Sequence, residues 1–155
     1  MSCSFFYLTF AKRLINSLIY IFIQIILKIG EKVPEFQMLD QNGIQRTNNK
    51  LKSPLVLFFY PKDDTPGCTI EVCGFRDKYD LFKVLGAEVW GVSNGNTASH
   101  LAFANKNKLQ YPLLCDTNDS LRKIFGVPKV LGLLDGRVTY VIDRKGIVRH
   151  IYRDL

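Results

Sequence analysis

The sequence predicts a single α/β domain with a central mixed sheet flanked by helices and an N-terminal β-hairpin extension. Three features predict this class: an apolar run at residues 54–60, a helical repeat of apolar residues over 66–85, and a second apolar run at 87–93. An apolar run without alternation is typical of a strand covered on both faces. Strand–helix–strand with short connections forms a right-handed parallel unit. A chain of 155 residues can bury a core of its own.

The remaining elements are predicted from turn residues and periodicity. Gln41-Asn42-Gly43 is a hairpin turn between residues 34–40 and 43–47, and Gly86 ends the helix that begins at residue 66. The closing antiparallel hairpin adds two strands at one edge of the sheet, which gives a thioredoxin-like layout. The other predicted elements are a helix at 97–109, a short extended segment at 111–115, a helix from Asn118 or Asp119 to Phe125, and strands at 138–142 and 147–152.

Composition excludes several classes of protein. Apolar residues make up 47% and charged residues 23%, as in a globular domain. The net charge of +7 comes without a dense Lys/Arg cluster, so we expect no nucleic-acid binding. The four cysteines are too few for a disulfide scaffold.

Residues 1–26 differ from the rest, because a largely apolar segment follows Lys12 and Arg13. Three interpretations stay open. A signal peptide has this order but needs a small-residue cleavage site, and a membrane anchor needs about 20 apolar residues. The third, a mis-assigned start, is favoured because an ordinary domain start follows at residue 27. We expect a bacterial cytoplasmic protein, or a plastid or membrane-associated one if residues 1–26 belong to the mature protein.

The candidate site lies at residues 61–68, beyond the carboxyl end of a predicted parallel strand, where open α/β sheets place their sites. Thr65 suits the helix N-cap, where its hydroxyl can accept from a backbone N–H, and Pro66 suits the first helical position. Cys68 then lies in the first turn, near the positive end of the helix dipole. A thiol placed there ionises more easily, and the thiolate is the nucleophile.

Other interpretations compete at each of these residues. Cys68 could be a small buried hydrophobe, and Arg137, at the start of a later strand, could lie beside the thiolate or be a surface charge. Cys73 lies about 7.5 Å along a helix from Cys68 and about 140° around it, too far for a disulfide, whose Cα atoms lie within about 7 Å. Cys73 therefore either faces the core or bonds to Cys68 after the first turns unwind.

The stretch resembles a known family. The string Pro61-x-x-x-Thr65-x-x-Cys68 is similar to the peroxiredoxin active-site motif. The longer run FFYPKDDTPGCTIEVCGFRD resembles the peroxiredoxin Q subfamily, also called bacterioferritin comigratory proteins. The similarity covers about residues 27–155 and implies a thioredoxin-like fold of the peroxiredoxin type.

The resemblance implies a thiol peroxidase that reduces hydrogen peroxide and organic hydroperoxides. Cys68 would be the peroxidatic cysteine, which peroxide oxidises to a sulfenic acid. Thr65 and Arg137 would hold the peroxide and stabilise the thiolate, and Pro61 would shield the site. Cys73 would resolve the sulfenic acid as an intramolecular disulfide, which thioredoxin or a similar dithiol would reduce. No metal or other cofactor is implied, and we expect a monomer.

The chain departs from the family at both ends. Residues 1–26 have no counterpart in the family core, and the family continues into a C-terminal helix where this sequence ends at Leu155. We therefore expect an exposed apolar sheet face. Cys115 is interpreted as a core cysteine, and His100 and His150 as structural or surface residues. Two alternative functions remain: a thiol–disulfide oxidoreductase on the same fold, and a non-catalytic membrane-tethered protein.

Overall fold

The computed structural model describes residues 26–130 and 134–154. The expectations for the N-terminal extension therefore lie almost wholly outside the described residues. Among those residues, no helix is long and apolar enough to cross a membrane.

A five-stranded mixed sheet with the strand order β5-β4-β3-β8-β9 forms the centre of the fold. β3 pairs parallel with β4 and antiparallel with β8, and β4 pairs parallel with β5. The expected α/β class and edge hairpin are confirmed. The strands of this sheet are β3 (Leu55–Phe59), β4 (Glu88–Ser93), β5 (Leu113–Cys115), β8 (Arg137–Ile142) and β9 (Val148–Asp154).

Two small hairpins accompany this sheet. The expected hairpin consists of β1 (Gln37–Leu39) and β2 (Gln45–Thr47). The Asp40 carboxylate holds its turn by accepting from the backbone N–H groups of Asn42 and Ile44. The sequence did not predict the second hairpin, β6 (Lys129–Val130) with β7 (Leu134–Asp135).

The helices occupy both sides of the sheet. The single helix expected over residues 66–85 is wrong, because the chain breaks at Lys78 (φ −104°, ψ 6°) into α2 and α3. Gly86, with a φ of +66°, follows α3 and stops it as expected. The helices are α2 (Pro66–Asp77), α3 (Tyr79–Val84), α4 (Thr97–Asn107), α5 (Ser120–Ile124) and the 3-10 turn η1 (Asn48–Lys50).

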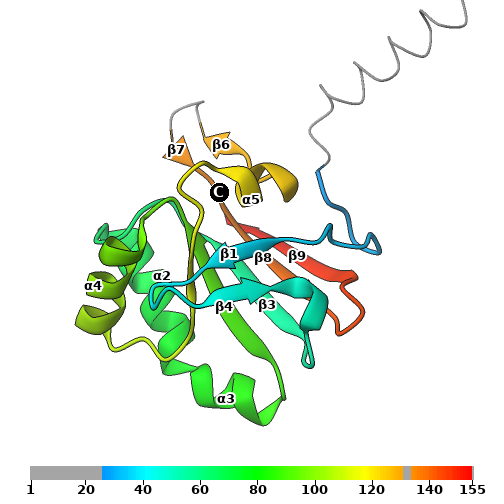
Figure 1. Cartoon of the computed structure of the whole chain (residues 1–155), viewed down its shortest axis with the longest axis horizontal. Coiled ribbons are helices and arrows are strands. Elements are labelled where there is room, and N and C mark those ends of the chain that lie inside the picture. The colour runs from blue at the N-terminus through cyan, green and yellow to red at the C-terminus, as the bar shows by residue number, and fades with distance from the viewer. Residues whose placement is uncertain (1–25, 131–133, 155) are drawn as a thin grey trace, which may run out of the picture.

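Strand β3 is buried on both faces because its alternate residues enter two separate cores. Phe58 packs with residues of α2 and α4, including Val72 and Phe103. Phe59 points the other way and packs with Phe125, just after α5. Figure 1 shows β3 in the middle of the fold, with α2 and α4 gathered on one flank. The loop that follows β3 therefore begins at a strand that is packed on both faces.

Candidate active site

Cys68 is the third residue of α2 and lies nine residues beyond the last residue of β3, Phe59. Its side chain is buried, with 1% exposed. Thr65 occupies the N-cap position and Pro66 the first helical position, as predicted. The expected capping bond is wrong: the Thr65 hydroxyl donates to the Lys62 carbonyl at 3.3 Å and accepts no helix N–H. The helix start therefore leaves backbone N–H groups free to face a ligand near the sulfur.

Arg137 lies beside the sulfur. It begins β8, whose antiparallel pairing with β3 carries it to the end of the sheet where the α2 loop starts. Its Nη2 lies 3.2 Å from Cys68 Sγ. Gly67 makes room for this approach, since a Cβ there would lie 3.0 Å from Nη2. A permanent cation therefore faces the thiol.

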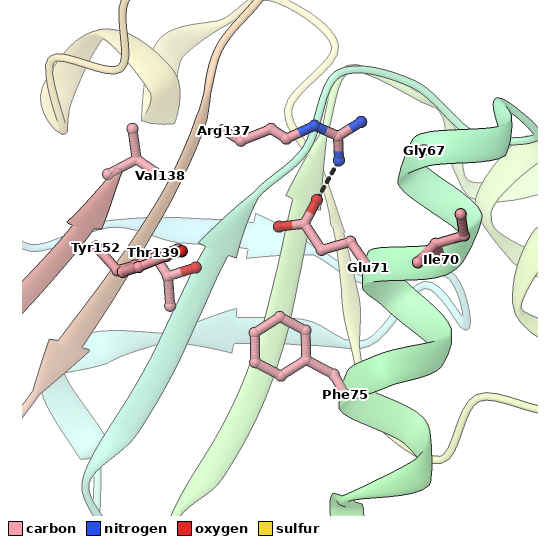
Figure 2. A pocket seen from close by; sticks show the side chains of 8 residues that line it. All are labelled: Gly67, Ile70, Glu71, Phe75, Arg137, Val138, Thr139 and Tyr152. Carbon is pink, nitrogen blue, oxygen red and sulfur yellow. Dashed lines mark hydrogen bonds and ion pairs between the residues drawn. The ribbon is translucent and has the colours of Figure 1, made fainter. Parts of the chain in front are cut away.

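Glu71 contacts the other terminal nitrogen of Arg137. It lies one helical turn after Cys68, and its carboxylate accepts from Arg137 Nη1 (Figure 2). Burial alone would lower the pKa of Arg137, but Glu71 and then Cys68 more than offset burial and raise the pKa. Glu71 was not predicted as a site residue, although an acidic residue three positions after a reactive cysteine lies on the same face of the helix.

A pocket of about 440 Å³ opens beside this cluster. Figure 2 shows Arg137 and Glu71 at its polar end and Phe75 across from β8. Ile70, Val138 and Tyr152 complete its apolar part. A ligand could therefore place a small polar group beside Arg137 and an apolar group against the adjacent apolar wall of the pocket.

Asp63 fastens the loop that precedes α2. Its carboxylate accepts from the Tyr60 hydroxyl at 2.8 Å and the Ser99 hydroxyl at 2.7 Å, and contacts His100 Nδ1 at 2.8 Å. Burial alone would raise the pKa of Asp63, but hydrogen bonds from His100 and Ser99 hold it below its usual value. His100 is fully buried. The structural role expected for His100 is therefore to join α4 to the loop that precedes Cys68.

The carbonyl of Pro61 is also held in place. The Ser93 hydroxyl, at the end of β4, donates to it at 3.2 Å. The loop between β3 and α2 is therefore tied to β4 through Pro61 and to α4 through Asp63.

Cys73 lies half-buried on the same helix, and both Cys68 and Cys73 are free thiols. Its Sγ lies 3.7 Å from Asn107 Oδ1, at the end of α4. Arg76 donates to the Asn107 carbonyl at 2.9 Å, and the Tyr111 hydroxyl donates to the Val72 carbonyl at 2.7 Å. Cys73 therefore belongs to the part of α2 that is anchored to its surroundings.

The other sequence candidates lie away from the sulfur. Cys115 is half-buried, and burial, followed by the charges of Asp40 and Asp63, raises its pKa to about 11. His150 is exposed on β9. In the described parts of the chain, no group of three or more His, Cys, Asp or Glu residues could hold a metal ion.

A mixed thioredoxin-like sheet that presents a buried thiol at a helix N-terminus, next to an arginine, defines the class of thiol-based redox domains. The sequence profile of the AhpC/TSA family matches residues 29–151. The chain belongs to the AhpC/TSA family, in its peroxiredoxin Q group.

Relatives of known name agree with this assignment. Over 127 residues the chain is 49% identical to chloroplastic peroxiredoxin Q of Triticum aestivum and 50% identical to that of Arabidopsis thaliana. Each alignment covers 81% of this chain, and it covers 58% of the Triticum aestivum protein and 59% of the Arabidopsis thaliana protein. The chain thus spans about three-fifths of the length of these relatives.

Solved structures show the same fold. Peroxidoxin BcpB from Mycobacterium tuberculosis superimposes with a TM-score of 0.76 at 37% identity, covering 82% of this chain and 86% of that one. The bacterioferritin comigratory protein of Xanthomonas campestris, described for its alkyl peroxide reduction activity, superimposes with a TM-score of 0.75 at 30% identity, covering 84% and 87%.

Proposed function

We propose that the protein is a thiol peroxidase that reduces hydrogen peroxide and organic hydroperoxides. One observation carries the proposal: the 3.2 Å contact between Cys68 Sγ and Arg137 Nη2 at the start of α2. A cation and a helix N-terminus both favour the thiolate, which is the form that attacks. Membership of the AhpC/TSA family supports the same reaction.

In the first step the Cys68 thiolate attacks one oxygen of the O–O bond. The S–O bond forms as the O–O bond breaks, so the sulfur becomes a sulfenic acid and the other oxygen leaves with a proton as water or an alcohol. Arg137 donates to the peroxide, and this interaction strengthens as negative charge moves onto the leaving oxygen. The Thr65 hydroxyl donates to the Lys62 carbonyl, and its oxygen can accept from the peroxide O–H. Pro61 shields the thiolate from water.

In the second step the Cys73 thiol attacks the sulfenic sulfur, which forms a disulfide and releases water. Both residues lie in α2, so its first turns unwind for the two sulfurs to meet. A dithiol such as thioredoxin then reduces the disulfide by exchange. Because both cysteines belong to one chain, the cycle needs only a monomer.

The pocket supports a substrate range that includes organic hydroperoxides. Its apolar part, formed by Ile70, Phe75 and Val138, lies next to Arg137 and could take an alkyl group. The Xanthomonas campestris relative is described for alkyl peroxide reduction. The most similar relatives reported above are chloroplastic, which favours a plastid location over the bacterial cytoplasm.

One equivalent of peroxide followed by non-reducing mass analysis tests the proposal. The wild-type protein should lose two hydrogen atoms, with the new bond between the peptides that carry Cys68 and Cys73. Cys68→Ser should not react. Cys73→Ser should stop at a sulfenic acid that dimedone captures, and thioredoxin should fail to recycle it.

Cys115→Ser serves as the matched control. The high pKa of Cys115 keeps its thiol protonated near neutral pH, so this variant should react like the wild type. A wild-type protein that shows no fast oxidation at Cys68 would overturn the proposed activity. Normal thioredoxin-dependent turnover by Cys73→Ser would overturn only the resolving role.

A further inference from the structure

Arg122 is a buried charge that the proposed chemistry does not use. It belongs to α5, and only 2% of the residue is exposed. Its guanidinium lies over the Phe59 ring, 5.7 Å from the centroid. A guanidinium removed from water is costly unless its N–H groups find partners, so the contacts of Arg122 indicate what it stabilises.

The guanidinium contacts two backbone carbonyls from distant parts of the chain. Nη2 donates to the Tyr60 carbonyl and Nη1 to the Gly136 carbonyl, both at 3.0 Å. Nε lies 3.9 Å from Asp119 Oδ1. Its planar fork can hold two acceptors in one fixed geometry, which an ammonium group cannot do.

Both carbonyls lie immediately before a residue of the site. Tyr60 precedes Pro61, where the loop to Cys68 begins, and Gly136 precedes Arg137. The antiparallel pairing of β3 with β8 ends at Phe59 and Val138, so both carbonyls lie outside the paired region. Arg122 thus spans the two segments at the point where the sheet no longer holds them together.

Arg122 is itself fixed by the start of α5. The Asp116 carboxylate accepts from the backbone N–H groups of Leu121 at 3.0 Å and Arg122 at 2.8 Å. The Asp116 N–H in turn donates to the Ser93 carbonyl at the end of β4 at 2.8 Å. The guanidinium therefore occupies a position set by the central sheet.

We infer that Arg122 is a positioning residue for the peroxide reaction: it sets the separation of the Pro61 loop and Arg137, and thereby the contact between Cys68 and Arg137. The inference rests on the proposed function. Its action is indirect, because its guanidinium donates to the backbone carbonyls that precede Pro61 and Arg137.

The test compares Arg122→Met and Arg122→Lys with Arg137→Met and with the exposed control Arg149→Met. Two quantities are measured: the rate constant for oxidation by hydrogen peroxide, and the pH at which alkylation of Cys68 by iodoacetamide is half-maximal. Arg122→Met should lower the rate constant by about 10- to 100-fold, as expected for a small misplacement of reacting groups. The alkylation midpoint should move to higher pH, in the same direction as in Arg137→Met.

A purely structural Arg122 would lower the melting temperature and leave both quantities unchanged for the folded protein. A folded Arg122→Met variant within twofold of the wild type, with an unchanged midpoint, overturns the inference. If Arg122→Met does not fold, Arg122→Lys decides, because lysine keeps the charge but lacks the planar fork that holds the two carbonyls in one fixed geometry. A lysine variant with wild-type rate and midpoint overturns the inference. Absence of peroxide reaction in the wild type would defeat the proposed function instead, and the alkylation midpoint would still test the positioning.

Discussion

The two ends of helix α2 differ in what holds them. At the first end, the side chain of Cys68 faces a charged cluster of Arg137 and Glu71, and Ile70 is 75% exposed. At the second end, hydrogen bonds to backbone carbonyls anchor the helix: the Tyr111 hydroxyl donates to the Val72 carbonyl, and the Arg76 side chain donates to the Asn107 carbonyl at the end of α4. The first end thus holds the reactive thiol of Cys68, and the second end is attached to the surrounding structure.

This difference indicates which sulfur moves when a disulfide forms. Unwinding the first turn exposes little additional apolar surface around Pro66 and Gly67, which are already exposed. Unwinding the second half would break the buried contact of Tyr111. We therefore expect Cys68 to travel toward a nearly stationary Cys73.

The largest effect should follow from removing the cation at the first end. Arg137→Met should slow oxidation of Cys68 by about 100-fold or more, as for the loss of one preorganised charged donor. Disulfide formation after oxidation should change little, because Cys73 and its anchors are untouched. Stopped-flow fluorescence resolves the two steps, and equal slowing of both would contradict the distinction between the two ends.

An intermediate effect should follow from releasing the loop that precedes the first end. Asp63→Asn should lower the free energy of unfolding by about 2 to 4 kcal/mol at pH 7, because a buried carboxylate with several hydrogen bonds is lost. The pKa of Asp63 is lowered in the folded protein. Its contribution is therefore complete above the unfolded value of about 3.9 and disappears as pH falls through the folded value.

Denaturant unfolding at several pH values measures this dependence. The difference in stability between wild type and Asp63→Asn should be largest near neutral pH and shrink below about pH 4. A difference that stays constant down to pH 2 would show that the charge of Asp63 is not what stabilises the loop.

The smallest effect should follow from loosening the second end. Burial raises the pKa of the Tyr111 phenol, so the hydroxyl remains a donor to Val72. Tyr111→Phe should cost about 1 kcal/mol of stability. Hydrogen exchange of the amides at 74–77 should become faster, while the rate of peroxide oxidation stays within about twofold. A fall in the rate of peroxide oxidation beyond this limit would mean that the two ends of α2 are coupled.

The sequence predicted the parts of the site that depend on local chemistry. A proline, a threonine and a cysteine at a helix start form a short pattern. The residue pattern left Arg137 open between a partner of the thiolate and a surface charge, and the family resemblance favoured the first. The break at Lys78 escaped prediction because the apolar spacing of residues 72–85 continues across it.

The supporting residues were missed because their partners are distant in the sequence. Asp63 meets His100, 37 positions away, and Arg122 meets Tyr60, 62 positions away. No local pattern marks a carbonyl as the acceptor of a buried arginine. The Thr65 bond was mispredicted for the opposite reason, since the side chain donates its hydroxyl to a nearby loop carbonyl in an orientation in which its oxygen accepts no helix N–H.

The break at Lys78 has a consequence for recognition by a reductant. α3 follows α2 as a separate short helix and carries the exposed side chains of Leu81 and Val84. In the proposed cycle, the start of α2 unwinds while the part that contacts Tyr111 and precedes α3 stays in place. The reduced and disulfide forms therefore share the exposed apolar surface of α3 and differ in the adjacent start of α2. A dithiol protein that contacts both helices can distinguish the disulfide form, its substrate, from the reduced form, its product, by shape.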